Sequence, residues 1–163
     1  MDKPFRILGI NHIAISTLNR QGMQQLWVQV FGARADHGFS SEEENVREDV
    51  YFLGEPPYQV QIDIMEPIDV AKNPGLTAFP LNHIGLWVDD LPTAFEWMKS
   101  KGIRFTSGGI RKGSAGHDVC FIHPKGNADF PIGGGGVLVE LVQAPPDVLR
   151  SSRQGMSVRS CTS

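Results

Sequence analysis

Apolar and polar positions along the chain follow two different periods. Residues 10–15 and 81–88 alternate apolar with polar side chains, which predicts two half-buried strands. Residues 18–31 repeat apolar side chains at helical spacing up to Gly32, a residue type that commonly ends a helix. The first part of the chain is therefore predicted to form a strand and then a helix.

The same order of elements follows the second strand. Asp90 can cap a helix whose first turn tolerates Pro92 and which ends at Gly102. Further strands are predicted where short apolar runs are bounded by turn residues, at residues 49–53, 59–65, 118–122 and 136–142.

The chain contains an internal repeat. Residues 11–15 (Asn-His-Ile-Ala-Ile) recur as residues 82–86 (Asn-His-Ile-Gly-Leu), and residues 60–64 (Val-Gln-Ile-Asp-Ile) match residues 137–141 (Val-Leu-Val-Glu-Leu). Such a repeated unit is too small for a core of its own and buries its apolar face against its copy. We therefore predict two halves of the same fold, related by a pseudo-twofold axis.

The repeat predicts an α+β fold of two tandem βαβββ modules that form a curved mixed sheet around a shared cleft. The modules cover about residues 6–67 and 81–145, and residues 68–80 connect them within a single domain at 1–150. Residues 151–163 are polar and unpatterned, so we expect a disordered C-terminal tail.

Composition narrows the class of protein. The net charge is −3 over 163 residues without a basic stripe, so nucleic acid is not the expected partner. No apolar run approaches the roughly 18 residues of a membrane span. Two cysteines, Cys120 and Cys161, do not make a disulfide framework, which favours a reducing compartment and a cytoplasmic location.

Polar residues inside the repeated strands are the candidate functional residues. His12 corresponds to His83, and Asp63 corresponds to Glu140. Burying four such groups without partners would cost roughly 1–3 kcal/mol apiece, and a shared cation removes this cost. Two imidazoles and two carboxylates therefore predict a site for one divalent metal ion in the cleft.

The identity of the metal and of one ligand stays open at this point. The donor set suits cobalt, nickel, manganese, iron or zinc. Gln61 or Glu66 would replace Asp63 if the strand register differed by two or three residues. A single histidine in a strand is more often a hydrogen-bonded structural residue than a ligand, and only the symmetry mates weaken that interpretation.

Five short segments carry a resemblance to a known family, namely residues 11–13, 82–85, 113–116, 121–125 and 136–141. They are similar to the vicinal oxygen chelate superfamily, which includes glyoxalases, bleomycin resistance proteins and dioxygenases. Within it, the segments resemble methylmalonyl-CoA epimerases more than glyoxalase I, over roughly residues 6 to 145.

The resemblance implies a metal-dependent isomerase or lyase that removes a proton next to a carbonyl. It also implies a homodimer. It matches the metal ligands to His12, Asp63, His83 and Glu140, although the position of Asp63 usually holds Gln or Glu in the family. It also implies that Glu48 and Glu140 are the catalytic bases. The expected substrate is an acyl-CoA thioester.

A CoA thioester would need cations at the rim of the site. Arg104, Arg111, Lys112 and Lys125 lie near strand ends of the second copy and are the candidates for this binding role.

Other activities remain open within and beyond the superfamily. Lactoylglutathione lyase is the nearest alternative. His12, His83 and Glu140 alone would suit the facial triad of an extradiol-type dioxygenase. A small-molecule-binding protein without turnover would keep the same fold.

Overall fold

The computed structural model describes residues 2–56, 58–72 and 80–157. The chain forms two compact units, which we call the first unit (residues 10–85) and the second unit (residues 1–9 with 86–163). Each corresponds mainly to one copy of the sequence repeat.

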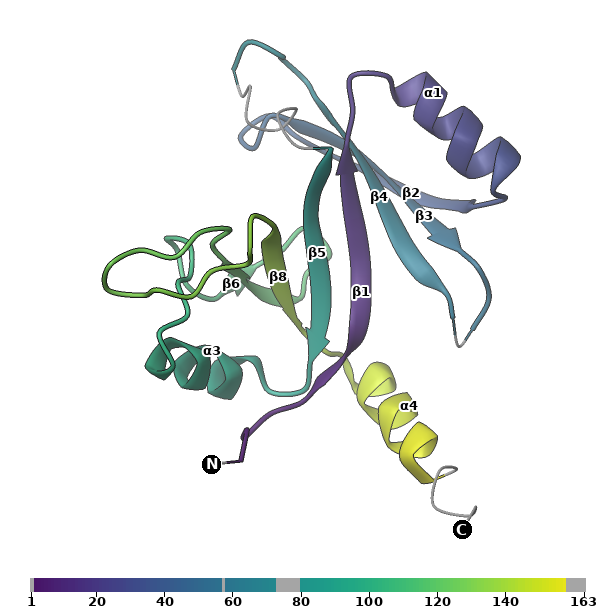
Figure 1. Cartoon of the computed structure of the whole chain (residues 1–163). Helices are drawn as coiled ribbons and strands as arrows, with labels where there is room; N and C mark the ends of the chain where they lie inside the picture. Colours follow the sequence, from purple (N-terminus) through teal and green to yellow (C-terminus); the bar gives the residue numbers. More distant parts are fainter. Residues whose placement is uncertain (1, 57, 73–79, 158–163) are drawn as a thin grey trace. The chain divides into compact units, whose positions relative to one another are not determined.

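The first unit has the βαβββ order that the repeat predicts. Its elements are β1 (Ile7–Ser16), α1 (Arg20–Gln24), the π-helical η1 (Gln25–Val30), β2 (Arg34–Ser41), β3 (Val46–Leu53) and β4 (Val60–Pro67). The strands lie in the order β2-β3-β4-β1, followed by β5 (Leu81–Val88), and α1 covers one side of β2 to β4 (Figure 1). β1 and β4 are parallel, whereas β3 pairs antiparallel with both β2 and β4.

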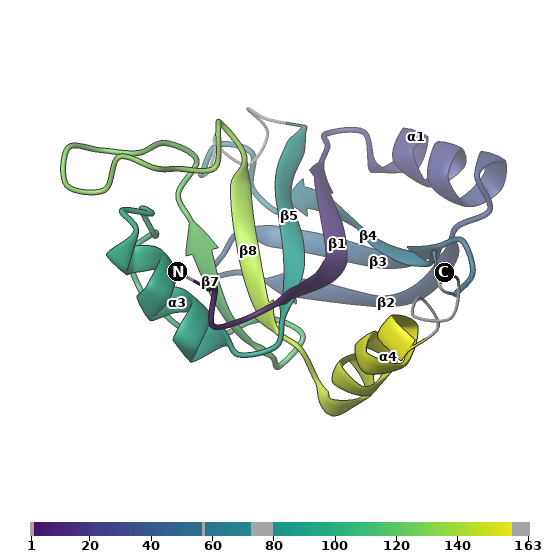
Figure 2. The same ribbon diagram turned by 60° about the horizontal axis from the view of Figure 1, so that its bottom comes forward.

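The second unit repeats this order of elements. After β5 come α3 (Leu91–Ser100), β6 (Arg111–Lys112), β7 (Asp118–Ile122), β8 (Leu138–Gln143) and α4 (Pro146–Ser157). The sheet runs β5-β8-β7-β6, and α3 lies beside β7 and β8 (Figure 2). The duplication is therefore confirmed in the order of the secondary structure.

The helix ends follow the predicted local chemistry. The side chain of Asn19 caps α1 by accepting a hydrogen bond from the backbone N–H of Gly22 (3.0 Å). Asp90 caps α3 in the same way through the N–H of Thr93 (3.1 Å). Gly32 and Gly102 follow the two helices with φ of 76° and 82°, a conformation that glycine adopts without steric cost.

Three elements differ from the sequence expectations. β2 is largely exposed and β6 has only two residues, so neither shows an apolar pattern. α4 extends to Ser157, where a disordered tail was expected from residue 151; residues 158–163 lie outside the described residues. Pro146 lies in its first turn, where the fixed φ of proline favours the start of a helix.

Each unit has its own core between its helix and one face of its sheet, so the expectation that a repeated unit is too small for a core of its own is wrong. In the first unit, Ile62 and Ile64 pack with Tyr51 against Met23 and Trp27 of the helix. In the second unit, the core contains buried residues of α3, β5, β7 and β8 together with the N-terminal segment: Phe5, Val88, Leu91, Ala94, Met98, Cys120 and Leu141. The other face of the first unit's sheet carries a second apolar cluster, in which Ala14, Val46 and Met65 are buried, beside its polar residues.

Candidate functional site

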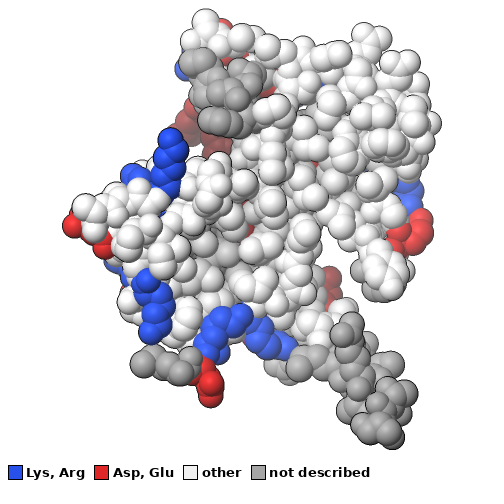
Figure 3. All heavy atoms as spheres, in the orientation of Figure 1, with Lys and Arg blue, Asp and Glu red and all other residues white. Residues whose placement is uncertain are grey.

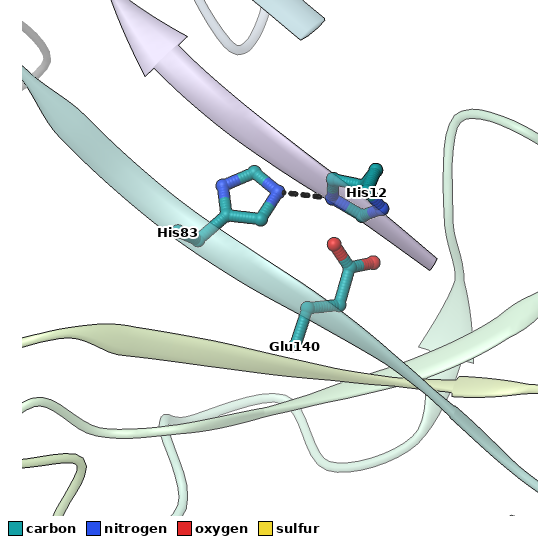
Figure 4. Close-up of side chains that lie close together, drawn as sticks. All are labelled: His12, His83 and Glu140. Atoms are coloured by element: carbon teal, nitrogen blue, oxygen red, sulfur yellow. Dashed lines mark hydrogen bonds between the residues drawn. The ribbon is translucent and has the colours of Figure 1, made fainter. Parts of the chain in front are cut away.

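Two histidines meet on the face of the first unit's sheet that lies opposite its helix. His12 comes from β1 and is 7% exposed, and His83 comes from β5. Their Nε2 atoms lie 2.7 Å apart and their rings are nearly perpendicular, at 88° (Figure 4). The predicted pairing of the two symmetry-related imidazoles is therefore present.

Glycine makes room for this arrangement. A Cβ atom added at Gly85 would lie 2.4 Å from both Nδ1 and Cε1 of His12, closer than any real contact allows. The imidazole of His12 therefore occupies the space that any other residue at position 85 would fill.

Asp63 of β4 lies beside the histidines. It is 4% exposed, and its Oδ2 atom is 3.9 Å from Nε2 of His12. Gln61 donates hydrogen bonds from Nε2 to both carboxylate oxygens, at 2.9 and 3.2 Å. Gln61 thus lies next to Asp63 on the same face, whereas Glu66 lies on the opposite face and pairs with Arg47.

Glu48 shares this face of the sheet. In the β3–β4 register, Glu48 lies opposite Met65 and Val50 lies opposite Asp63. Since side chains alternate along a strand, Glu48 and Asp63 point to the same side. The β1–β4 register, with Ala14 opposite Asp63, adds His12 to that side. Glu48 is half-buried there.

Glu140 occupies the corresponding position in the second unit. It is 8% exposed and lies opposite Phe121 in the β7–β8 register. Its neighbour Leu141 points into the helix-covered core, so Glu140 points to the other face. Burial, and to a smaller extent the negative charge of Glu140, raises the pKa of the Cys120 thiol to about 12.

The donor set in the first unit fits a divalent metal ion. Imidazole nitrogens and carboxylate oxygens are ligands that several transition metals share. Two Nε2 atoms and a carboxylate on one buried, polar face of a sheet therefore form a suitable partial set.

The four predicted substrate-binding cations lie in the second unit, and the side chains of three of them have structural contacts. Arg104 donates to the carbonyl of Lys125 (3.1 Å), Arg111 lies over the ring of Phe121, and Lys112 pairs with Asp118 (2.8 Å). On the face shown in Figure 3, Lys and Arg side chains form separate spots and no continuous basic patch.

Comparisons with known proteins identify the family. The model of the Glyoxalase/Bleomycin resistance protein/Dioxygenase superfamily matches residues 11–121. The chain belongs to this superfamily. It is also 30% identical over 140 residues to the mitochondrial methylmalonyl-CoA epimerase of Dictyostelium discoideum, which covers 81% of this chain and 76% of that protein.

Solved structures agree with this assignment to the superfamily. The methylmalonyl-CoA epimerase of Mycobacterium tuberculosis has a TM-score of 0.70 and 25% identity, covering 92% of this chain and 97% of that one. A variant of the Streptomyces coelicolor enzyme in complex with 2-nitronate-propionyl-CoA has a TM-score of 0.66 and 25% identity, covering 85% and 99%. The fold of two tandem βαβββ modules predicted from the repeat, and its implied likeness to the glyoxalase superfamily, are confirmed.

Sequence reasoning missed the residues that support the candidate metal ligands His12 and His83. Ser16, Asn82 and Gly85 each contact a candidate ligand or its neighbour. The repeated Asn-His-Ile segment contained the signal for the asparagines. The need for glycine at position 85 depends on how closely β5 approaches β1, which no single segment encodes.

Proposed function

We propose that the protein is a metal-dependent methylmalonyl-CoA epimerase. The observation that carries this proposal is the placement of His12, Asp63 and Glu48 on one face of a sheet, in a chain similar to epimerases over most of its length. The acyl-CoA analogue held by the Streptomyces coelicolor relative supports a thioester substrate.

The proposed ligands are His12, His83, Asp63 and Glu140. Each imidazole and carboxylate offers one donor atom to a single divalent ion. When bound, the ion supplies a Lewis acid that stabilises negative charge developing on the carbonyl oxygen of the substrate.

The proposed proton chemistry belongs to Glu48 and Glu140. One carboxylate takes the proton from the carbon next to the thioester carbonyl, and the conjugate acid of the other returns a proton to the opposite side of that carbon. Glu48 is half-buried and Glu140 is buried, so both carboxylates are shielded from bulk water, as a site for proton transfer requires.

The test is solvent deuterium incorporation into methylmalonyl-CoA by protein reconstituted in turn with cobalt, nickel, manganese, iron and zinc. We expect exchange that is lost in His83→Ala together with bound metal. Turnover of the glutathione hemithioacetal of methylglyoxal without exchange would instead indicate a lactoylglutathione lyase. Oxygen uptake with a catechol would indicate a dioxygenase.

Arg104, Arg111, Lys112 and Lys125 remain the proposed cations for the CoA phosphates. Charge reversal at Lys125, which is exposed, should raise KM for the thioester and leave kcat unchanged.

Assembly and location also remain predictions. Sedimentation should show a homodimer, and cell fractionation tests the expected cytoplasmic location. Among the described residues, none belongs to a helix with the length and apolar character that crossing a membrane requires. The Dictyostelium discoideum and human relatives are named as mitochondrial.

A further inference from the structure

An asparagine precedes each candidate histidine and contacts it. Oδ1 of Asn11 lies 2.5 Å from Nδ1 of His12, and Oδ1 of Asn82 lies 2.8 Å from Nδ1 of His83. The same contact therefore occurs in both copies of the repeat.

A third residue orients one of the two amides. Nδ2 of Asn82 donates a hydrogen bond to Oγ of Ser16 (3.1 Å), and Ser16 is 6% exposed. The backbone of Ser16 is itself held, since its N–H donates to the carbonyl of Pro80 (2.8 Å). With its NH₂ group occupied by Ser16, Asn82 presents its oxygen to His83.

These contacts decide which ring nitrogen carries the proton. An amide oxygen only accepts hydrogen bonds, so Nδ1 of each histidine must be the donor. In the neutral imidazole the other nitrogen then carries the lone pair. The Nε2 atoms of His12 and His83, which face each other at 2.7 Å, are thereby both left as electron-pair donors.

We infer that Asn11 and Asn82 are positioning residues that hold His12 and His83 in the Nδ1–H tautomer, with Ser16 as the anchor of Asn82. This inference rests on the proposed metal site and explains why both imidazoles direct Nε2 to one point. Ligating histidines in proteins commonly depend on such an acceptor at the other nitrogen.

The direct test is the protonation of Nδ1 in metal-free protein labelled with ¹⁵N-histidine. Spectra are recorded about two units above the ordinary imidazole pKa of about 6.5, where histidine is neutral. We expect a protonated Nδ1 at His12 and His83 in the wild type. Asn11→Leu should move the proton from Nδ1 to Nε2 at His12 alone, and Asn82→Leu should do so at His83 alone.

Two variants and one internal control sharpen the result. Asn82→Asp keeps an acceptor oxygen and should keep Nδ1 of His83 protonated, which separates loss of the acceptor from general damage to the fold. His117, whose ring packs on Trp87, should show unchanged signals throughout. Ser16→Ala should give a mixture of tautomers at His83.

Zinc affinity, measured by competition with a chelator, provides a second readout. Each Asn→Leu variant should bind zinc about 10–100-fold more weakly, and Asn82→Asp should recover most of the loss. If wild-type Nδ1 atoms are not protonated, or if the Leu variants leave the tautomers unchanged, the inference is wrong. If the tautomers shift as expected and the wild type binds no zinc, the asparagines have the inferred role and the proposed metal site fails instead.

Discussion

The two faces of the sheet in the first unit use neighbouring carboxylates for different purposes. Glu48 and Asp49 are adjacent on β3 and therefore point to opposite faces. Glu48 lies on the face of His12 and Asp63. Asp49 lies under the helix, where Arg20 donates to both of its oxygens at 2.6 and 2.5 Å.

The two carboxylates differ in role, since Asp49 stabilises the fold and Glu48 is a candidate catalytic base. The hydrogen bonds from Arg20 hold the pKa of Asp49 below its ordinary value, so this carboxylate is fixed in the ionised state. A group fixed in this way cannot exchange protons near neutral pH. Glu48 lies on the other face of β3, opposite Met65 in the β3–β4 register. One strand thus supplies a structural ion pair and a candidate base.

The largest expected effect is on catalysis, from Glu48→Gln. Removing a general base lowers the rate by about 10²–10⁴-fold. Deuterium exchange into methylmalonyl-CoA should fall by this factor, while the melting temperature and the bound metal stay at wild-type levels. Wild-type exchange in this variant would remove Glu48 from the mechanism.

Gly85→Ala should disturb the face of the sheet that carries His12 and Asp63, the histidine face. It should leave the face covered by α1, the helix face, unchanged. The added Cβ would overlap the ring of His12, and such overpacking costs about 1–3 kcal/mol of unfolding free energy. We also expect zinc to bind about tenfold more weakly, because His12 has to move. Gly38→Ala is the matched control, since its Cβ would meet its nearest neighbour at an ordinary 3.5 Å. Equal zinc affinity in both variants would contradict the expectation.

Asp49→Asn tests the helix face. Loss of the charged hydrogen bonds to Arg20 should lower the free energy of unfolding at neutral pH by about 1.5 kcal/mol. Because folding lowers the pKa of Asp49, its contribution is present above the ordinary value of 3.8 and is lost as the pH falls through the folded value. Denaturation curves of wild type and variant should therefore converge below about pH 4. A constant difference across this range would show that the charge of Asp49 is not responsible.

The sequence predicted the histidine face better than the helix face. His12, His83 and Asp63 could be found because a polar residue inside an apolar strand is unusual, and the repeat showed a counterpart for each. Strand alternation places each of them on one side of its own strand, and the β1–β4 register brings His12 and Asp63 to a common face. Arg20 and Asp49 gave no such signal, because two charged residues far apart in the chain look like ordinary surface residues.

Elements without an apolar pattern were also beyond prediction. β2 is stabilised by its pairing with β3, so it needs no regular apolar side in the sequence. The hydrogen bond from Nε of Arg6 to Oδ2 of Asp89 (2.8 Å) likewise joins residues that are far apart in the chain. Periodicity therefore located the strands that carry the site, and tertiary contacts decided what supports them.

The smallest expected effect is from Tyr51→Phe, on the helix face. The hydroxyl of Tyr51 accepts a hydrogen bond from Gln24 (3.2 Å) and donates a longer one to Asp49 (3.4 Å). Its loss should cost about 0.5–1.5 kcal/mol of unfolding free energy and should leave exchange activity and zinc affinity unchanged. Chemical denaturation and the exchange assay on the same preparation measure both. A loss of exchange activity in the folded variant would mean that packing under the helix affects Glu48 through β3. The two faces would then not be independent.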